Sequence, residues 1–315
     1  MHLRAAVLGL AGICSLTAQD SVERVFSFRQ VETPQLQQEV FNALRSVAGV
    51  QNASLDRAAR AITVTGPATQ IAAAEWTFKE LDRPDQPSAP NPHEFTPEGM
   101  GDAVVCVYTV SQSQTPQSMQ EMVNAARSVA DIQRLFPVSG IHAVVMRGTA
   151  AQVALAKWML QQLDAPSPAT AMVPVVRPYA ATEFAVRIFF LANIQTPQAL
   201  MEVVNAARSV ADVQRFFPVN QTHSIVMRGT AEQAELCEWM MQRLDTAGPA
   251  TAGEFVVPNG VVRLFIPTSG QPLQELVNRA RSESQAVRVY PVNARAAVAF
   301  RGTAAQAELA AGVLK

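Results

Sequence analysis

The sequence has too few cysteines for a disulfide framework. It contains three, and Cys14 lies in an N-terminal segment that we expect to be removed. Only Cys106 and Cys237 would then remain, whereas small exported domains held by disulfides carry several pairs. We therefore expect both to be small buried side chains, with a single bridge in an oxidising compartment as the alternative.

The chain also lacks an excess of charge of either sign and the motifs of common catalytic sites. Its 25 basic and 26 acidic residues give a net charge of -1, which argues against a nucleic acid or an anionic membrane surface as partner. His93, His142 and His223 are scattered, whereas a metal site needs clustered ligands. No glycine-rich phosphate loop or nucleophile elbow is present. We predict no enzyme activity, metal or cofactor.

No apolar run is long enough to span a bilayer. Residues 1–19 are typical of a signal peptide, because Arg4 precedes the short apolar run Ala5–Cys14 and the small residue Ala18 follows it. A buried helix, a signal anchor and a lipid-anchored Cys14 are the alternatives. Cleavage would place the protein in the periplasm or outside the cell, with no transmembrane segment left.

The most informative feature is an internal repeat. "NAARSVADIQRLFPV" (Asn124–Val138) returns almost unchanged as "NAARSVADVQRFFPV" (Asn205–Val219). Weaker copies begin at Asn42 and Asn278, and "ITVTG", "VVMRG", "IVMRG" and "VAFRG" follow at matching positions. Four copies separated by Pro-rich or small-residue stretches indicate a tandem array. We expect modules at 22–83, 103–165, 184–246 and 260–315, the last truncated in its final helix, joined by linkers at 84–102, 166–183 and 247–259.

Each copy is predicted to fold as β-α-β-β-α. In the second copy, Val104–Val110 alternates like a strand, and Thr115-Pro116 is a typical helix start. "IQRLFPV" and "HAVVMRG" follow as two more strands, and Thr149 with Gln152 forms a capping box for a second helix. The fold class is therefore α+β, with a three-stranded sheet and two helices on one face in each module.

The segment "VVMRGTAAQVALAKWMLQQLDAP" (Val144–Pro166) resembles the last strand and helix of the periplasmic N-domains of bacterial secretins. The resemblance extends to all four copies and implies ring-forming or partner-docking modules. Because no pore-like β-rich segment follows the fourth copy, it does not imply a channel. The same element order is similar to KH-type RNA-binding domains, but no copy has the Gly-x-x-Gly loop that those domains need.

Strand alternation predicts an arginine and aromatic surface on the sheet face that points away from the helices. Solvation of this face is one interpretation. The other is docking, because arginine and aromatic residues are enriched at interface centres. The predicted surface comprises Arg134, Phe136, Arg147, Arg187, Phe189, Arg215, Phe217, Arg228, Arg263, Phe265, Arg288, Tyr290 and Arg301.

Three tryptophans occupy one equivalent position on the second helix of copies one to three: Trp76, Trp158 and Trp239. Helical periodicity places them nearly opposite the buried face. We therefore expect head-to-tail packing, with the tryptophan face of each copy on the sheet of the next and cation–π contacts between them. The same surfaces could instead join separate chains into a ring.

Together these features predict an exported, non-catalytic scaffolding protein that binds protein partners or associates with itself into a homo-oligomer, and serves a cell-envelope secretion or pilus assembly. The alternative is a free-standing periplasmic protein that binds an extended peptide or a glycan along the array. No nucleic acid partner is expected.

Overall fold

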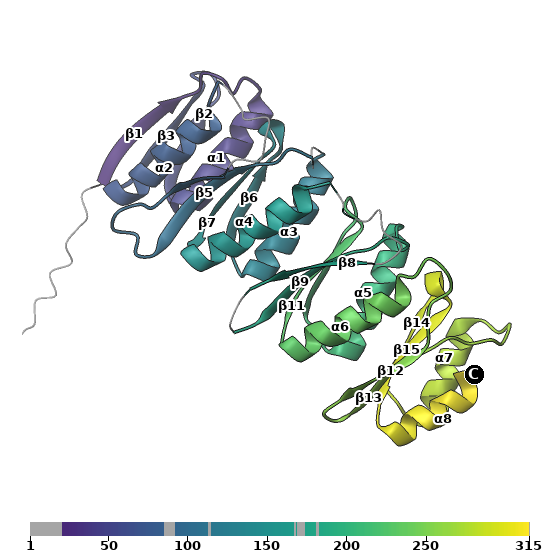
Figure 1. The fold of residues 1–315 in the computed structure, drawn as a ribbon. Coiled ribbons are helices and arrows are strands. Elements are labelled where there is room, and N and C mark those ends of the chain that lie inside the picture. The colour runs from purple at the N-terminus through teal and green to yellow at the C-terminus, as the bar shows by residue number, and fades with distance from the viewer. Residues whose placement is uncertain are drawn as a thin grey trace, which may run out of the picture.

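A computed structural model describes residues 21–84, 92–112, 115–166, 168, 174–180 and 183–314. The predicted signal peptide lies outside these residues, as does Cys14. Four α+β modules follow one another in a row, from the purple N-terminal module to the yellow C-terminal one in Figure 1. No helix in the described part of the chain is long and apolar enough to cross a membrane.

Module 1 has the predicted three-stranded sheet with two helices on one face. The strands pair antiparallel in the order β1-β3-β2. Its elements are β1 (Ser21–Ser27), α1 (Pro34–Ala48), β2 (Asn52–Asp56), β3 (Ala61–Pro67) and α2 (Ala68–Leu81).

Modules 2, 3 and 4 each have a fourth strand that pairs with the first predicted one, so the prediction of three strands is wrong for them. Module 2 comprises β4 (Pro92–Phe95), β5 (Ala103–Thr109), α3 (Pro116–Ala130), β6 (Arg134–Val138), β7 (Ala143–Thr149) and α4 (Ala150–Asp164). Module 3 comprises β8 (Val175–Tyr179), β9 (Ala185–Phe190), α5 (Pro197–Ala211), β10 (Arg215–Val219), β11 (Ser224–Gly229) and α6 (Ala231–Leu244). Module 4 comprises β12 (Gly253–Val257), β13 (Gly260–Phe265), α7 (Leu273–Ser284), β14 (Arg288–Val292), β15 (Ala297–Gly302) and α8 (Ala304–Leu314).

The additional strands β4, β8 and β12 come from the segments predicted as linkers. These strands are short and two of them contain proline, Pro92 in β4 and Pro178 in β8. Proline cannot donate a ladder hydrogen bond, but an edge strand tolerates it. The proline content that suggested linkers is therefore compatible with edge strands.

The helix starts follow the predicted local signals. Thr115 caps α3 and accepts from Ser118 N, with Pro116 at the first position of the helix. Complete capping boxes begin α4, at Thr149 and Gln152, and α6, at Thr230. These bonds satisfy backbone donors that have no partner within the helix.

The aspartate of the "LD" sequence at the end of each module's second helix holds a loop by hydrogen bonds. This loop connects the module's first predicted strand to its first helix. Asp245 accepts hydrogen bonds from the backbone N–H groups of Ala192, Asn193 and Ile194 at 2.6, 2.7 and 2.9 Å. Burial raises the pKa of the Asp245 carboxyl, and these three hydrogen bonds oppose the rise. Asp82 and Asp164 bond the corresponding loops of modules 1 and 2. This recurring aspartate is therefore a structural residue.

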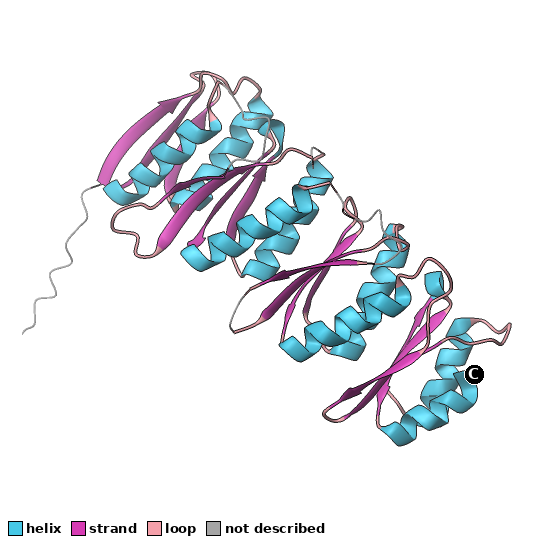
Figure 2. Ribbon diagram, in the orientation of Figure 1, coloured by secondary structure: helices cyan, strands magenta, loops and turns pink. Residues whose placement is uncertain are grey.

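Figure 2 shows that sheet and helix layers alternate along the row of modules. The sheet of each later module faces the helices of the preceding one. This arrangement covers both faces of the sheets in modules 2 to 4, which explains why their central strands are apolar on both sides.

Candidate functional site

Consecutive modules contact each other through surfaces that recur along the array. We call the contacts between modules 1 and 2, 2 and 3, and 3 and 4 the first, second and third junctions. At the second junction, Val186, Ile188 and Val226 of module 3 lie in the hydrophobic cluster of module 2 and are fully buried. Equivalent residues at the other junctions are Val105, Val107 and Val145, and Val262, Leu264 and Ala299. Removal of this apolar surface from water stabilises each junction.

The aromatic residues predicted on the second strand of each sheet lie on the outward face at these junctions. Phe136, Phe217 and Tyr290 pack against the clusters of modules 1, 2 and 3, respectively. An arginine from the same module as each ring lies 5.3–5.6 Å from its centroid. These arginines are Arg127, Arg208 and Arg281, which belong to the repeated "NAARS" and "NRARS" sequences.

The predicted arginines of the third strand reach the end of a helix in the preceding module. Arg228 Nη1 donates to the carbonyl of Val129 at 2.8 Å, and Arg301 Nη1 donates to that of Val210 at 2.8 Å. Both carbonyls belong to the last turn of a helix, where a cation also interacts favourably with the helix dipole. Desolvation by burial lowers the pKa of the Arg228 guanidinium.

At the first junction, Arg134 and Arg147 lie against Gly49. Gly49 ends α1 in the left-handed conformation, with φ 74°. A Cβ at this position would lie 3.0 Å from Arg134 Nη1 and 3.2 Å from Arg147 Nη1. Gly49 therefore provides both the backbone conformation of the helix end and the space that the two guanidinium groups occupy.

The predicted arginines at the start of the second strand form ion pairs across the later junctions. Arg215 lies 3.3 Å from Asp131, and Arg288 lies 3.4 Å from Asp212. Both aspartates end a helix of the preceding module. These pairs are partly exposed, so they contribute more to orientation than to stability.

Sequence reasoning missed a glutamate that accepts hydrogen bonds from the next module at each junction. Glu121 accepts hydrogen bonds from Asn220 N at 2.9 Å and Asn220 Nδ2 at 3.0 Å. Glu202 accepts from Ala294 N at 2.9 Å, and Glu39 accepts from Gly140 N at 3.3 Å. The available signal was the recurrence of glutamate three residues before each repeated asparagine.

The tryptophans contact the next module, but through strands that the sequence did not reveal. Trp76 stacks on Phe95 of β4 with 5.5 Å between centroids. Trp158 lies 5.1 Å from Tyr179 of β8, and Trp239 lies 5.6 Å from Phe255 of β12. Aromatic pairs of this kind stabilise a contact by more than the burial of their apolar area alone. The expected cation–π contact with the next sheet is wrong for Trp239, because the arginine over its ring is Arg243 of the same helix.

The predicted orientation of the first-strand residues is also wrong. Phe189 and Phe265 lie in or against the core of their own module, and Arg187 pairs with Met227 on that same inner face. Arg263 bonds Glu254 and Glu308 of module 4. Because the strand is apolar on both faces, alternation could not distinguish the outward face from the inward one.

The residues considered for chemistry are dispersed. Among the described residues, no group of three or more His, Cys, Asp or Glu side chains could hold a metal ion. Cys106 and Cys237 are free thiols, each buried in the core of a different module. Burial raises the pKa of each thiol to about 12, which leaves them protonated and unreactive at neutral pH.

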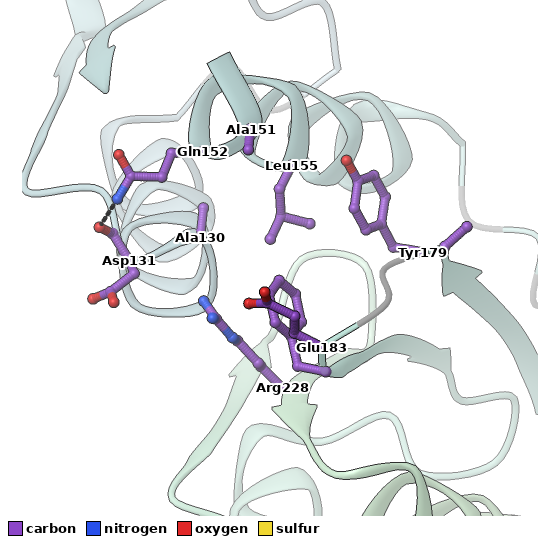
Figure 3. Close-up of a pocket in the computed structure, with 10 residues that line it drawn as sticks. Ala130, Asp131, Ala151, Gln152, Leu155, Tyr179, Glu183 and Arg228 are labelled. Carbon is purple, nitrogen blue, oxygen red and sulfur yellow. Dashed lines mark hydrogen bonds between the residues drawn. The ribbon is translucent and has the colours of Figure 1, made fainter. Parts of the chain in front are cut away.

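An open pocket lies at the second junction, with a volume of about 620 Å³. In Figure 3, Leu155 of α4 and Tyr179 of β8 lie next to each other on one side of it, and Glu183 and Arg228 lie on the other side. Gln152 donates to the backbone carbonyl of Asp131 at 2.6 Å at its edge. The ring of Phe184 covers the Arg228 guanidinium, with 3.7 Å between Cζ and the ring centroid.

Comparison with known proteins gave matches among solved structures only. No family profile and no curated protein matches the chain. The N-terminal domain of the secretin XcpQ from Pseudomonas aeruginosa is 16% identical, covering 46% of this chain and 63% of its own, with a TM-score of 0.20. ExeD of Aeromonas hydrophila is 16% identical over 72% of this chain and 41% of its own, with a TM-score of 0.17.

A third match is the ETEC pilotin–secretin complex AspS–GspD, which is 13% identical, covers 94% of this chain and 55% of the matched one, and has a TM-score of 0.18. The chain thus spans less than two thirds of the length of each of these three structures. The resemblance to secretin N-domains is found again among solved structures, at low identity and low TM-score.

Proposed function

We propose that the chain is an exported, non-catalytic scaffolding protein that binds other proteins in a cell-envelope secretion or pilus assembly. The observation that supports this most directly is the repeated junction. Apolar packing, an arginine at a helix end and an aromatic pair recur at the second and third junctions. Modules joined in this way hold a fixed relative orientation, as a scaffold requires.

The two ends of the array differ in their side chains from the faces that meet at the junctions. The outward sheet face of module 1 carries Asn52, Ser54 and Thr65 in place of the aromatic and arginine residues of later modules. On α7, Arg279 and Glu283 form an exposed pair at positions where α3 has Ala125 and Val129. Leu309 of α8, at the position of the buried Leu155, is 55% exposed, so the end of the array at module 4 keeps part of the apolar surface that the junctions use.

In-cell photo-crosslinking of a tagged chain tests this proposal in the organism that encodes it. We expect the tag in the exported fraction and crosslinks to proteins of a secretion or pilus assembly. A chain that carries Phe190→Ala is altered only at the second junction. It should lose crosslinks to partners that contact modules on both sides of that junction. Retention of the tag in the cytosol, or the absence of envelope proteins among the crosslinked products, would contradict the proposal.

A further inference from the structure

The first junction contains two arginines that have no acidic partner. Arg134 of β6 and Arg147 of β7 lie directly opposite each other, and both lie against Gly49 at the end of α1. Among the described residues, neither guanidinium forms an ion pair with a carboxylate. Within the same part of the chain, Arg134 Nη1 is buried without a hydrogen-bond partner. The two like charges therefore lack a counter-charge from a side chain.

The later junctions have an aspartate at the position of Gly49. Asp131 pairs with Arg215, the first residue of β10, and Asp212 pairs with Arg288, the first residue of β14. Both aspartates have a φ of 58°, close to the φ of 74° at Gly49. The same left-handed position of the repeat thus provides a carboxylate at two junctions and no side chain at the first.

A third arginine at the first junction, Arg45, lacks the contacts of its counterparts. Arg127 and Arg281 each donate to a backbone carbonyl of the following strand and lie over an aromatic ring of that strand. Module 1 has Ser54 at the position of that ring, so Arg45 has no such ring to cover. Arg45 and Arg134 line one open pocket of about 430 Å³.

The lining of this pocket suits a negatively charged group. Besides the two arginines, it contains side chains that can donate hydrogen bonds, namely Asn42, Ser46 and Gln51. The third junction has an equivalent pocket of about 410 Å³, whose lining includes Asp212 together with Arg208 and Arg288. The chain therefore provides its own carboxylate in the pocket at the third junction and none in the pocket at the first.

We propose that the pocket at the first junction binds a carboxylate side chain of a partner protein. Arg45 and Arg134 donate charge-assisted hydrogen bonds to this group, and the positive charge of Arg147 favours it further. This inference rests on the proposed function in taking the partner to be a protein. It commits to a carboxylate because the chain itself supplies that group at the same position of the later junctions.

An NMR titration of the chain lacking residues 1–19, with arginine and glycine labelled with nitrogen-15, tests the proposal. The probe is a glycine and serine peptide with blocked ends and one aspartate. It is added at constant ionic strength, because salt screens interactions between exposed charges. We expect saturable shifts of the Nε–H signals of Arg45 and Arg134 and of the Gly49 amide. The same peptide with asparagine in place of aspartate should cause none.

Gly49→Asp supplies the missing carboxylate from the chain itself. It should weaken binding of the aspartate peptide by about tenfold or more, which corresponds to the loss of one charge-assisted hydrogen bond. Gly49→Asn is the matched control, because asparagine has the same shape and tolerates the left-handed conformation without adding a charge. It should bind the peptide more tightly than Gly49→Asp by about the same factor.

Asp212→Gly removes the carboxylate that the third junction provides. It should create a second site, with new shifts at Arg288 on addition of the aspartate peptide. Thermal melting verifies that each variant is folded.

Equal binding of the peptide by the Gly49→Asp and Gly49→Asn chains would overturn the inference. So would shifts that exclude Arg45 and Arg134, or binding of inorganic phosphate without binding of the aspartate peptide. None of these results bears on the envelope crosslinking described above, which does not depend on this pocket. Conversely, absence of envelope partners with peptide binding intact would reject the proposed function alone.

Discussion

Phe189 and Phe190 are neighbours on β9 that serve two different cores. Phe189 is 0% exposed and contributes to the core of module 3, where its ring centroid lies 6.4 Å from that of Phe216. Phe190 is 1% exposed and belongs to the cluster of module 2. The two side chains therefore separate the stability of a module from the stability of a junction.

Truncation of either ring to alanine should cost about 3–5 kcal/mol, because a fully buried phenylalanine leaves a cavity. For Phe189→Ala the cost falls on module 3 itself. For Phe190→Ala it falls on the coupling between modules 2 and 3, since tandem arrays gain stability from interfaces between neighbours. The two variants should thus lose a similar amount of stability, but in different regions of the protein.

Hydrogen exchange followed by mass spectrometry distinguishes these outcomes. Phe189→Ala should speed exchange throughout α5 and α6. Phe190→Ala should leave those helices protected and speed exchange around Glu121 of α3, which contacts Asn220 at the same end of the second junction as Phe190. Equal exchange patterns in the two variants would refute the division of β9 between two cores.

Two further predictions concern buried polar and thiol groups. Asp245→Ala should lower the free energy of unfolding by about 2 kcal/mol or more, because it leaves backbone N–H groups without their acceptor; urea denaturation measures this, and an unchanged midpoint would contradict it. Cys106 and Cys237, with pKa values raised to about 12 by burial, should resist a thiol reagent at pH 8 in the native chain and react after unfolding. Rapid labelling of the folded chain would be inconsistent with their burial.

The sequence predicted the module well where strands have one distinctive face. On β6, Leu135 lies in the core, and Phe136 lies on the outward face against module 1. β9 has no such asymmetry, since Val186 and Ile188 on one side are as apolar as Phe189 on the other. An isolated sequence pattern cannot say which of two apolar faces a neighbouring module covers.

The sequence predicted that the tryptophans lie at contacts between modules, but it did not predict which residues they contact. Repetition of the tryptophans indicated a junction, but their partners Phe95, Tyr179 and Phe255 lie in segments too short and irregular for a strand prediction. A strand of four or five residues at a sheet edge is defined by its neighbour. Its own residues carry little periodic signal.

Small-angle X-ray scattering from the chain lacking residues 1–19 tests most directly whether the junctions fix the modules in one array. We expect a single elongated particle whose scattering matches the row of stacked modules in Figure 1. Scattering that requires a broad ensemble of module orientations would show that the junctions do not hold, and would contradict the scaffold proposal.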